Sequence, residues 1–307
     1  MTGRIFTADH QVYDLPPLLE WNGKHTGSVP CDSWSVTAVY QAEMAPVLKM
    51  AAGFAAMENG AAQLRGIVDE YSVELGSGGL TVTLAGRGYA ARLLDNESRP
   101  VTYEQVTLRE LIRRHAEPAD LRSTVPYTAG AGVSQWKVIS EFCRTYGGFL
   151  PRFAKTGELL ATPEQDSGKR IILDGSSPVL RCCLREDHYG VLTEALVIDK
   201  RQNVSYSVQN PEMIAKGGQC RRVIYTPGRS TWDAMRYTGE YQIRQSRQEE
   251  QAVTVELPGS FGAFPGDRVT LHLEKLGLTG LYRVAEAENR FSAREGAVMI
   301  WTLKECE

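Results

Sequence analysis

The chain has 307 residues, and 42% of them are hydrophobic, which is enough to build more than one buried core. Its 34 lysine and arginine residues are well mixed with 37 acidic residues, and the net charge is -3. This balance argues against a protein whose main task is to grip nucleic acid, and it excludes an acidic tail.

Targeting signals are also missing from the sequence. No run approaches the roughly 20 apolar residues of a membrane span, so we expect no membrane insertion. Residues 1–10 lack the apolar core of a signal peptide, which favours synthesis in a cytoplasm. The six cysteines form no C-x-x-C pair, and in a reducing compartment we expect them to be thiols that pack like small hydrophobic residues.

Residues 1–98 are rich in strand signals. Apolar and polar residues alternate over 33–40, which predicts a strand with Trp34 and Val36 on one face. Residues 64–75 and 80–85 are two further strand candidates, and the Gly-Ser-Gly-Gly sequence between them is typical of a hairpin turn.

Residues 47–57 are ambiguous. Their alanine, leucine and methionine content favours a helix, whereas the Asn59-Gly60 pair that follows is typical of a type I′ turn between strands. We choose the strand, and a helix buried in the monomer stays the alternative. A strand that is apolar on both faces needs cover on both sides, so Met50, Phe54 and Met57 are candidates for a subunit interface. On that hypothesis Phe54→Asp leaves a folded monomer and weakens the assembly.

The spacing of apolar residues changes from a strand pattern to a helix pattern at residues 99–165, which predicts a small α+β insert. Thr107 and Glu110 have the spacing of a capping box, which predicts a helix start. A second helix is expected to open near Ser134 and to end at Gly147-Gly148, followed by short strands at 149–153 and 158–162.

The remaining chain is expected to be mostly β, in a region at 166–251 and a C-terminal region at 252–307. In the first, residues 195–199 and 219–225 are strand candidates, and 230–237 is a short helix candidate. The second contains four strand candidates separated by turns, and their even spacing is typical of a small barrel. These four strands are predicted at residues 252–257, 268–274, 281–288 and 297–303.

Short motifs follow one another in a fixed order along nearly the whole chain, at residues 65–69, 84–87, 93–95, 107–112, 134–139, 146–150, 156–159, 264–267, 280–284 and 296–303. In this order and spacing they resemble the phage late control D / baseplate hub family, which also serves contractile injection systems and phage-like bacteriocins. The resemblance implies a mainly β fold with two tail-tube-like β-barrels, the α+β insert and a small C-terminal barrel-like region.

The same resemblance implies a structural role without catalysis or a cofactor. Three copies would form a homotrimeric ring that adapts the six-fold tail tube to a central spike, in contact with the tail tube protein, the spike protein and other baseplate proteins. DNA or an effector would pass through the channel without specific binding. The protein would assemble in the bacterial cytoplasm and reside in the baseplate of a virion tail or injection particle.

Sequence patterns that would indicate a catalytic, nucleotide-binding or metal site are weak. Residues 86–91 read G-x-G-x-x-A but lack the long helix of a dinucleotide site, so a turn is the better interpretation. Cys182 and Cys183, with Asp187 and His188, are the one dense set of metal-ligand types, yet adjacent cysteines on a strand point to opposite faces. We therefore expect no metal site.

Two alternative functions stay open. A tail-associated cell-wall hydrolase would need paired carboxylates or a Cys-His site, and acidic pairs at 186–187 and 249–250 are better interpreted as solvated surface. No G-x-S-x-G motif is present, although distant residues could still assemble a Cys-His or Ser-His-Asp site. A carbohydrate-binding module for host recognition would use exposed aromatic residues such as Trp232, Tyr237 and Tyr241.

Overall fold

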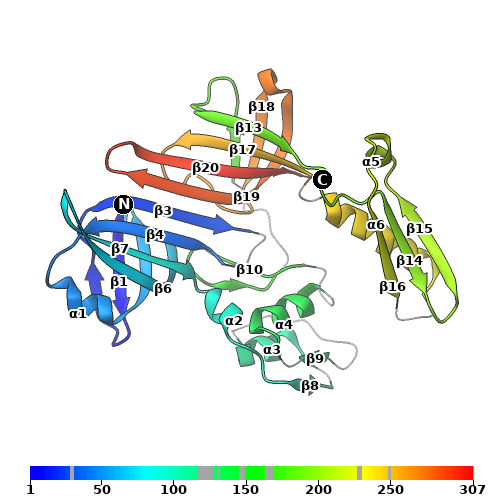
Figure 1. The fold of residues 1–307 in the computed structure, drawn as a ribbon, viewed down its shortest axis with the longest axis horizontal. Coiled ribbons are helices and arrows are strands. Elements are labelled where there is room, and N and C mark those ends of the chain that lie inside the picture. The colour runs from blue at the N-terminus through cyan, green and yellow to red at the C-terminus, as the bar shows by residue number, and fades with distance from the viewer. Residues whose placement is uncertain are drawn as a thin grey trace. The chain divides into compact units, whose positions relative to one another are not determined.

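The computed structural model of the chain describes residues 1–27, 31–104, 106–115, 127–129, 132–144, 149–162, 169–226, 230–247 and 250–306. It contains two compact units (Figure 1). Unit 1 comprises Met1–Arg181 and Val255–Thr302, and unit 2 comprises Cys182–Thr254 and Leu303–Glu307. Gly147, Gly148 and Glu249 lie outside the described residues.

Most of the β-structure belongs to one sheet of 13 strands. Its strands are β1 (Thr2–Thr7), β2 (Val12–Asp14), β3 (Leu18–Thr26), β4 (Ser33–Val39), β5 (Ala51–Glu58), β6 (Ala61–Gly76), β7 (Gly79–Gly88), β12 (Arg170–Leu173), β13 (Arg181–Glu186), β17 (Gln251–Pro258), β18 (Arg268–Leu273), β19 (Leu278–Ser292) and β20 (Gly296–Glu305). The strand order is β13-β17-β20-β19-β3-β4-β7-β6-β5-β1-β2, and β18 pairs with β19 and β12 beside this path. The chain is therefore mainly β, as its sequence predicts.

Local sequence signals explain the hairpins at one end of this sheet. Asn59 and Gly60 both have positive φ, 50° and 77°, as a type I′ turn requires, and they join β5 to β6. Gly76 pairs with Gly79 across the tight loop between β6 and β7. The strand interpretation of residues 47–57 is thus confirmed from Ala51 onward, whereas a short helix, α1 (Met44–Lys49), precedes it.

The two tail-tube-like β-barrels and the small C-terminal barrel-like region implied by the resemblance do not form closed barrels within the described part of a single chain. The sheet order is open, with β13 at one end and β2 at the other. The four C-terminal strands form as predicted, but β19 is 15 residues long and reaches beyond β18. Its residues 286–292 pair with residues 20–26 of β3, so the C-terminal strands extend the N-terminal sheet.

A hydrophobic core of unit 1 includes the aromatic residues Trp21, Trp34 and Phe54. Trp34 stacks on Phe54 with 4.0 Å between ring centroids, and Trp21 stacks on the same ring at 5.8 Å. The alternation over residues 33–40 explains this packing, because Trp34, Val36 and Ala38 are buried on one face of β4.

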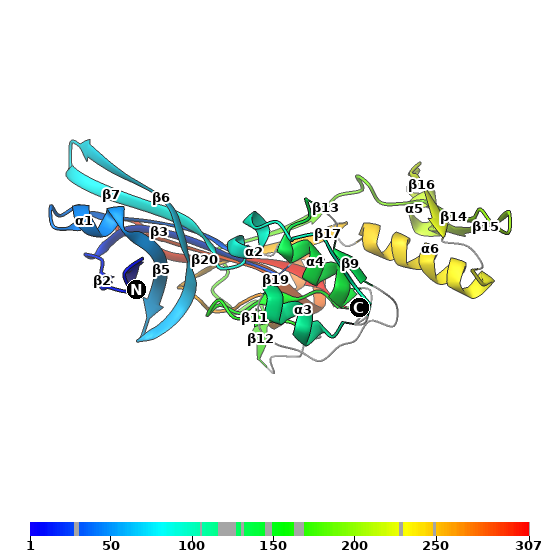
Figure 2. The ribbon, with the colours of Figure 1, turned by 90° about the horizontal axis from the view of Figure 1, so that it is seen from below.

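The α+β insert has its own core. It contains α2 (Ala91–Asp95), β8 (Val101–Tyr103), α3 (Leu108–His115), β9 (Tyr127–Ala129), α4 (Gln135–Phe142), β10 (Arg152–Phe153) and β11 (Leu159–Leu160), with α3 and α4 side by side in Figures 1 and 2. The capping box is confirmed: the Thr107 amide donates to Glu110 Oε2 at 2.9 Å, and the Glu110 amide donates to Thr107 Oγ1 at 3.1 Å. The helix start predicted near Ser134 is confirmed, and the Ser134 side chain caps α4.

Unit 2 contains a three-stranded sheet covered on one face by a helix. The sheet is formed by β14 (Glu194–Asp199), β15 (Val204–Gln209) and β16 (Arg221–Thr226), in the order β15-β14-β16, and α5 (Pro211–Ala215) follows β15. The covering helix, α6 (Trp232–Arg247), begins within the helix candidate at 230–237 but continues for 16 residues, and Thr231 Oγ1 accepts from the Ala234 amide at its start. Gly239 allows the close approach, because a Cβ there would lie 2.5 Å from Val208.

The two units divide the chain differently from the four expected segments, 1–98, 99–165, 166–251 and 252–307. Most of the expected C-terminal segment belongs to unit 1, because β19 pairs with β3. Unit 2 corresponds to the larger part of the expected segment 166–251.

Candidate assembly surface

The outer half of β6 is a free sheet edge. Residues 61–67 of β6 pair with β5 on one side, and residues 66–76 pair with β7 on the other. Beyond Ile67, no described strand occupies the side that β5 leaves. All residues from 69 to 76 are exposed, so a row of backbone donors and acceptors faces solvent there.

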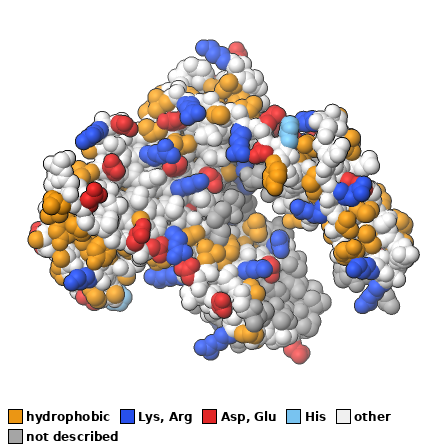
Figure 3. All heavy atoms as spheres, viewed as in Figure 1, with side chains coloured by type: hydrophobic (Ala, Val, Ile, Leu, Met, Phe, Trp, Pro, Cys, Tyr) orange, Lys and Arg blue, Asp and Glu red, His pale blue; other side chains and the backbone are white. Residues whose placement is uncertain are grey.

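This exposed segment is also apolar on one face. Tyr71, Val73 and Leu75 alternate with Glu70, Ser72 and Glu74, and Leu75 is 78% exposed. Across the hairpin, Tyr71 is paired with Leu84 and Val73 with Val82, two buried residues of β7. The apolar face of the core therefore continues outward onto an uncovered strand, at the end of unit 1 that Figure 2 shows as a projecting hairpin and Figure 3 shows with hydrophobic side chains at its surface. An apolar face beside a free edge is a ready template for another chain.

A charge cluster fixes the base of this free edge. The register of the β6–β7 pair shifts between Val68 and Glu70, so Asp69 lies in a bulge. Arg87 of β7 donates to both carboxylate oxygens of Asp69, at 2.8 and 3.0 Å, and to both oxygens of Asp95 in α2, at 2.8 and 3.0 Å. These hydrogen bonds raise the pKa of Arg87 and lower the pKa of Asp95.

The three candidate interface residues on the predicted strand do not form one surface. Phe54 is fully buried in the core of its own chain, so its side chain is not available to a neighbouring subunit in this fold. Met50 is exposed and Met57 is half-buried. An interface role for Met50 and Met57 stays a prediction. Sequence reasoning found the strand at 64–75 but missed its free edge, although the alternation from Glu70 to Leu75 was a readable signal.

Residues 86–88 form part of a strand rather than a turn. Gly86 and Gly88 lie in β7, which pairs with β4 and β6, and α2, which follows, has only five residues. A dinucleotide loop needs a long helix at this position, so this geometry is not that of a nucleotide site.

The metal-ligand types of unit 2 do not converge. No group of three or more His, Cys, Asp or Glu side chains suited to a metal ion occurs among the described residues. Cys182 and Cys183 lie on β13, and Asp187 accepts from the Tyr189 amide in a turn. His188 Nε2 lies 3.7 Å from Glu186 at an exposed position.

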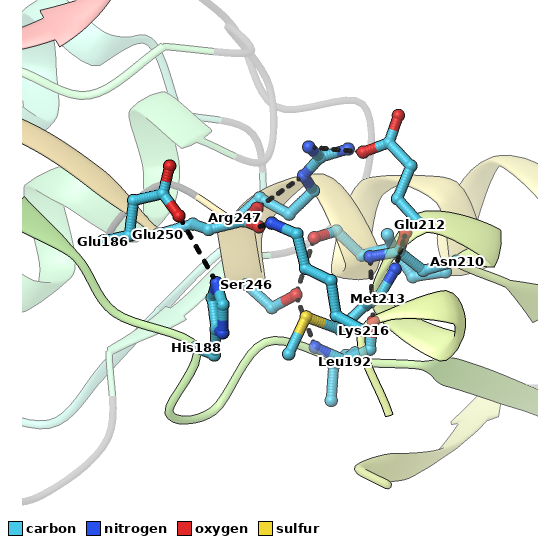
Figure 4. Close-up of polar contacts among 11 residues, drawn as sticks. Glu186, His188, Leu192, Asn210, Glu212, Met213, Lys216, Ser246, Arg247 and Glu250 are labelled. Carbon is cyan, nitrogen blue, oxygen red and sulfur yellow. Dashed lines mark hydrogen bonds and ion pairs between the residues drawn. The ribbon is translucent and has the colours of Figure 1, made fainter. Parts of the chain in front are cut away.

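A carboxylate of unit 2 that could serve catalysis is instead part of a structural network (Figure 4). Glu250 is contacted by Arg247 Nε at 2.8 Å and Lys216 Nζ at 3.2 Å, and Arg247 Nη2 also contacts Glu212 at 2.8 Å. Ser246 Oγ accepts from the Leu192 amide, and Asn210 Nδ2 donates to the Leu192 carbonyl. This network ties α5 and α6 to the start of β14.

The aromatic residues proposed for carbohydrate binding lie on α6. Trp232, Tyr237 and Tyr241 are all exposed, and Trp232 meets Tyr206 edge-on at 5.8 Å. In the part of the chain that the structure describes, no helix is long and apolar enough to span a membrane.

No protein-family model and no curated protein matches the sequence. Solved structures do match. The 43 kDa tail protein of prophage MuSo2 from Shewanella oneidensis has a TM-score of 0.77 and 13% identity over 99% of this chain and 98% of its own. The tail protein from Neisseria meningitidis MC58 has a TM-score of 0.73 and 13% identity over 99% and 96%.

A third match is the E. coli c3393 protein, a component of the type VI secretion system that exhibits structural similarity to the T4 bacteriophage tail proteins gp27 and gp5. Its TM-score is 0.60 with 11% identity, over 94% of this chain and 74% of its own. The chain thus has the fold of phage tail proteins, and the resemblance to the phage baseplate hub family that its sequence motifs carry is confirmed at the level of the fold.

Proposed function

We propose that the chain is a structural hub subunit of a phage-type baseplate, which forms a homotrimeric ring between a six-fold tail tube and a central spike. Two tail proteins share its fold over nearly their whole length, and the E. coli relative is similar to the tail proteins gp27 and gp5. The ring would leave a channel for DNA or an effector. Its other neighbours would be the tail tube protein, the spike protein and further baseplate proteins.

The free edge of β6 is the observation that carries this proposal. An open sheet with an exposed edge at residues 69–76 is prone to aggregate unless another strand covers it. In a closed ring each copy covers the free strand edge of its neighbour, so no strand edge stays exposed to solvent. The tail-tube-like barrels expected from the sequence would then be completed between copies rather than within one chain.

A mass measurement tests the ring. The purified protein is expected to have three times the 34.0 kDa mass of the chain in solution. Val73→Lys places a charge on the apolar face of the edge and is expected to shift the mass toward the monomer. Leu276→Lys is the matched control, because Leu276 is equally exposed, 45% against 43%, but lies in a 3-10 turn far along the chain at Glu274–Leu276. A monomeric wild-type protein at about 100 µM, or equal loss of trimer in both variants, would overturn the proposal.

A non-enzymatic role is part of the same proposal. The support is that Glu250 is held by two cations, while Glu186 at the end of β13 and His188 just beyond it are both exposed. Incubation with purified peptidoglycan is expected to release no soluble fragments. Clear release that survives further purification would favour a cell-wall hydrolase instead.

A further inference from the structure

One cavity of unit 1 places two positively charged side chains beside apolar walls. It has a volume of about 240 Å³ and lies between the end of β3, the start of β4, the β10–β11 hairpin and the turn before β18. Its wall includes His25, Asp32, Arg152, Phe153, Lys155 and Phe264. At about 30 Å³ for each water, this space fits roughly eight water molecules or a small organic ligand.

Two cations of the hairpin have no acidic partner among the described residues. Lys155 Nζ donates to Gln63 Oε1 at 3.0 Å and lies 4.5 Å from the centre of the Phe264 ring. Arg152 Nη1 donates to the Thr162 carbonyl at 3.3 Å. These described contacts are to neutral groups and do not neutralise either positive charge.

The one carboxylate of the wall is already engaged. Asp32 Oδ2 lies 2.9 Å from His25 Nδ1, and Asp32 Oδ1 accepts from the Thr26 amide at 3.0 Å. His25 is buried, its ring meets Phe264 edge-on at 5.1 Å, and its Nε2 has no partner among the described residues.

We propose that this cavity binds a monocarboxylate that carries a small apolar group. The guanidinium fork of Arg152 matches a planar carboxylate, and Lys155 adds a second positive charge. Phe153 and Phe264 suit an apolar body. Phosphate carries about 1.5 to 2 negative charges at neutral pH, and Asp32 in the same wall repels such a group more strongly than a single carboxylate.

A monocarboxylate with an apolar group can be a free small molecule or the C-terminal residue of another chain. Two probes represent these two kinds of ligand. Butyrate stands for the first and N-acetyl-leucine for the second, each titrated calorimetrically into the full chain at physiological ionic strength. Saturable one-to-one binding of either probe is expected. Binding of butyrate alone assigns a free ligand, and tighter binding of N-acetyl-leucine assigns a chain terminus. This proposal does not depend on the ring proposed above.

Two variants and a control test the residues. Lys155→Met and Arg152→Met keep the aliphatic stems and are each expected to weaken binding tenfold or more. Lys137→Met removes an exposed charge from α4 in the same insert and is expected to bind like the wild type. Circular dichroism checks that each variant is folded. Absence of saturable binding by both probes to the wild type, equal affinity in all variants, or binding of inorganic phosphate alone would overturn the assignment.

Discussion

Arg87 holds Asp69 through two parallel hydrogen bonds, from Nε at 2.8 Å and from Nη2 at 3.0 Å. Because Asp69 lies in the bulge of β6 and Arg87 lies in β7, this pair fixes the point where the free edge leaves the sheet. The same guanidinium binds Asp95, so α2 is tied to the hairpin as well. Two-pronged geometry of this kind is available to arginine and not to lysine.

Arg87→Lys is expected to loosen the hairpin without unfolding the chain. Exposed ion pairs contribute about 0.2–1 kcal/mol, so amide hydrogen exchange over residues 70–76 should rise by up to about fivefold. Arg4→Lys is the control, since Arg4 of β1 pairs with Asp14 of β2, beyond β5 from the free edge, and it should leave exchange at 70–76 unchanged. Unchanged exchange in Arg87→Lys would show that the bulge is held by the backbone alone.

Acid should remove part of this stabilisation. Arg87 lowers the pKa of Asp95 in the folded chain, so the unfolded chain binds more protons in the range between the two pKa values. The contribution of the Arg87–Asp95 pair to folding stability is therefore present above the ordinary aspartate pKa of 3.8, and it is lost as the pH falls through the lowered pKa of Asp95 in the folded chain. The urea midpoints of the wild type and Asp95→Asn are expected to differ slightly at pH 7 and to converge near pH 2. A difference that grows in acid would contradict the sign of this shift.

Gly66→Ala is expected to separate β6 from β7. A Cβ at Gly66 would lie 2.2 Å from the Arg87 carbonyl oxygen and 2.9 Å from Trp34 Nε1, so backbone must move. Overpacking of this kind destabilises by about 1–3 kcal/mol, which urea unfolding measures. Gly78→Ala, in the tight loop of the same hairpin, meets nothing within 4 Å and should stay within about 0.5 kcal/mol of the wild type. Equal stability of the two variants would show that this close approach is absent in solution.

Phe54→Ala is expected to destabilise the monomer rather than the assembly alone. Phe54 is fully buried between Trp21 and Trp34, and large-to-small changes at buried aromatic residues cost about 3–5 kcal/mol. Tryptophan fluorescence should change with it, because both neighbours are indoles. Met50→Ala, on the same part of the chain but exposed, should change stability by less than about 0.5 kcal/mol. A folded, equally stable Phe54→Ala monomer would instead favour the interface role predicted from the sequence.

Signals that act within a few residues were readable from the sequence. The capping box at Thr107 and Glu110, the turn at Asn59 and Gly60, and the helix start near Ser134 each involve atoms three or fewer residues apart, and each forms as predicted. The physical reason is that backbone geometry and side-chain hydrogen bonds at these sites are decided locally.

Features that depend on distant partners were not readable. The pairing of Phe291 with Trp21 joins residues from opposite ends of the chain, and no local pattern encodes it. For the same reason the cavity around Lys155 was missed, because its wall comes from four separate segments. The free edge of β6 lies between these cases: the alternation is local, but its exposure depends on where β5 ends.

Cys143 offers a test of the insert core by chemistry rather than by folding. Its side chain is fully buried beside α4, and this burial raises the pKa of the thiol to about 12. The thiolate is the reactive form, so a folded chain at pH 8 should label at exposed Cys183 and leave Cys143 unmodified, as peptide mass mapping would show. All six cysteines should react in urea.

Alkaline pH should weaken the same core. The folded thiol resists ionisation while the unfolded thiol ionises near its ordinary value of 9.0, so the stabilisation is complete below pH 9.0 and falls as pH rises toward the raised pKa of about 12. Cys143→Ala cannot ionise, and its urea midpoint should therefore decline less between pH 8 and pH 10.5 than that of the wild type. Cys183→Ala is the matched control and should follow the wild type. A parallel decline in all three proteins, or rapid labelling of Cys143 at pH 8, would place this thiol in contact with solvent.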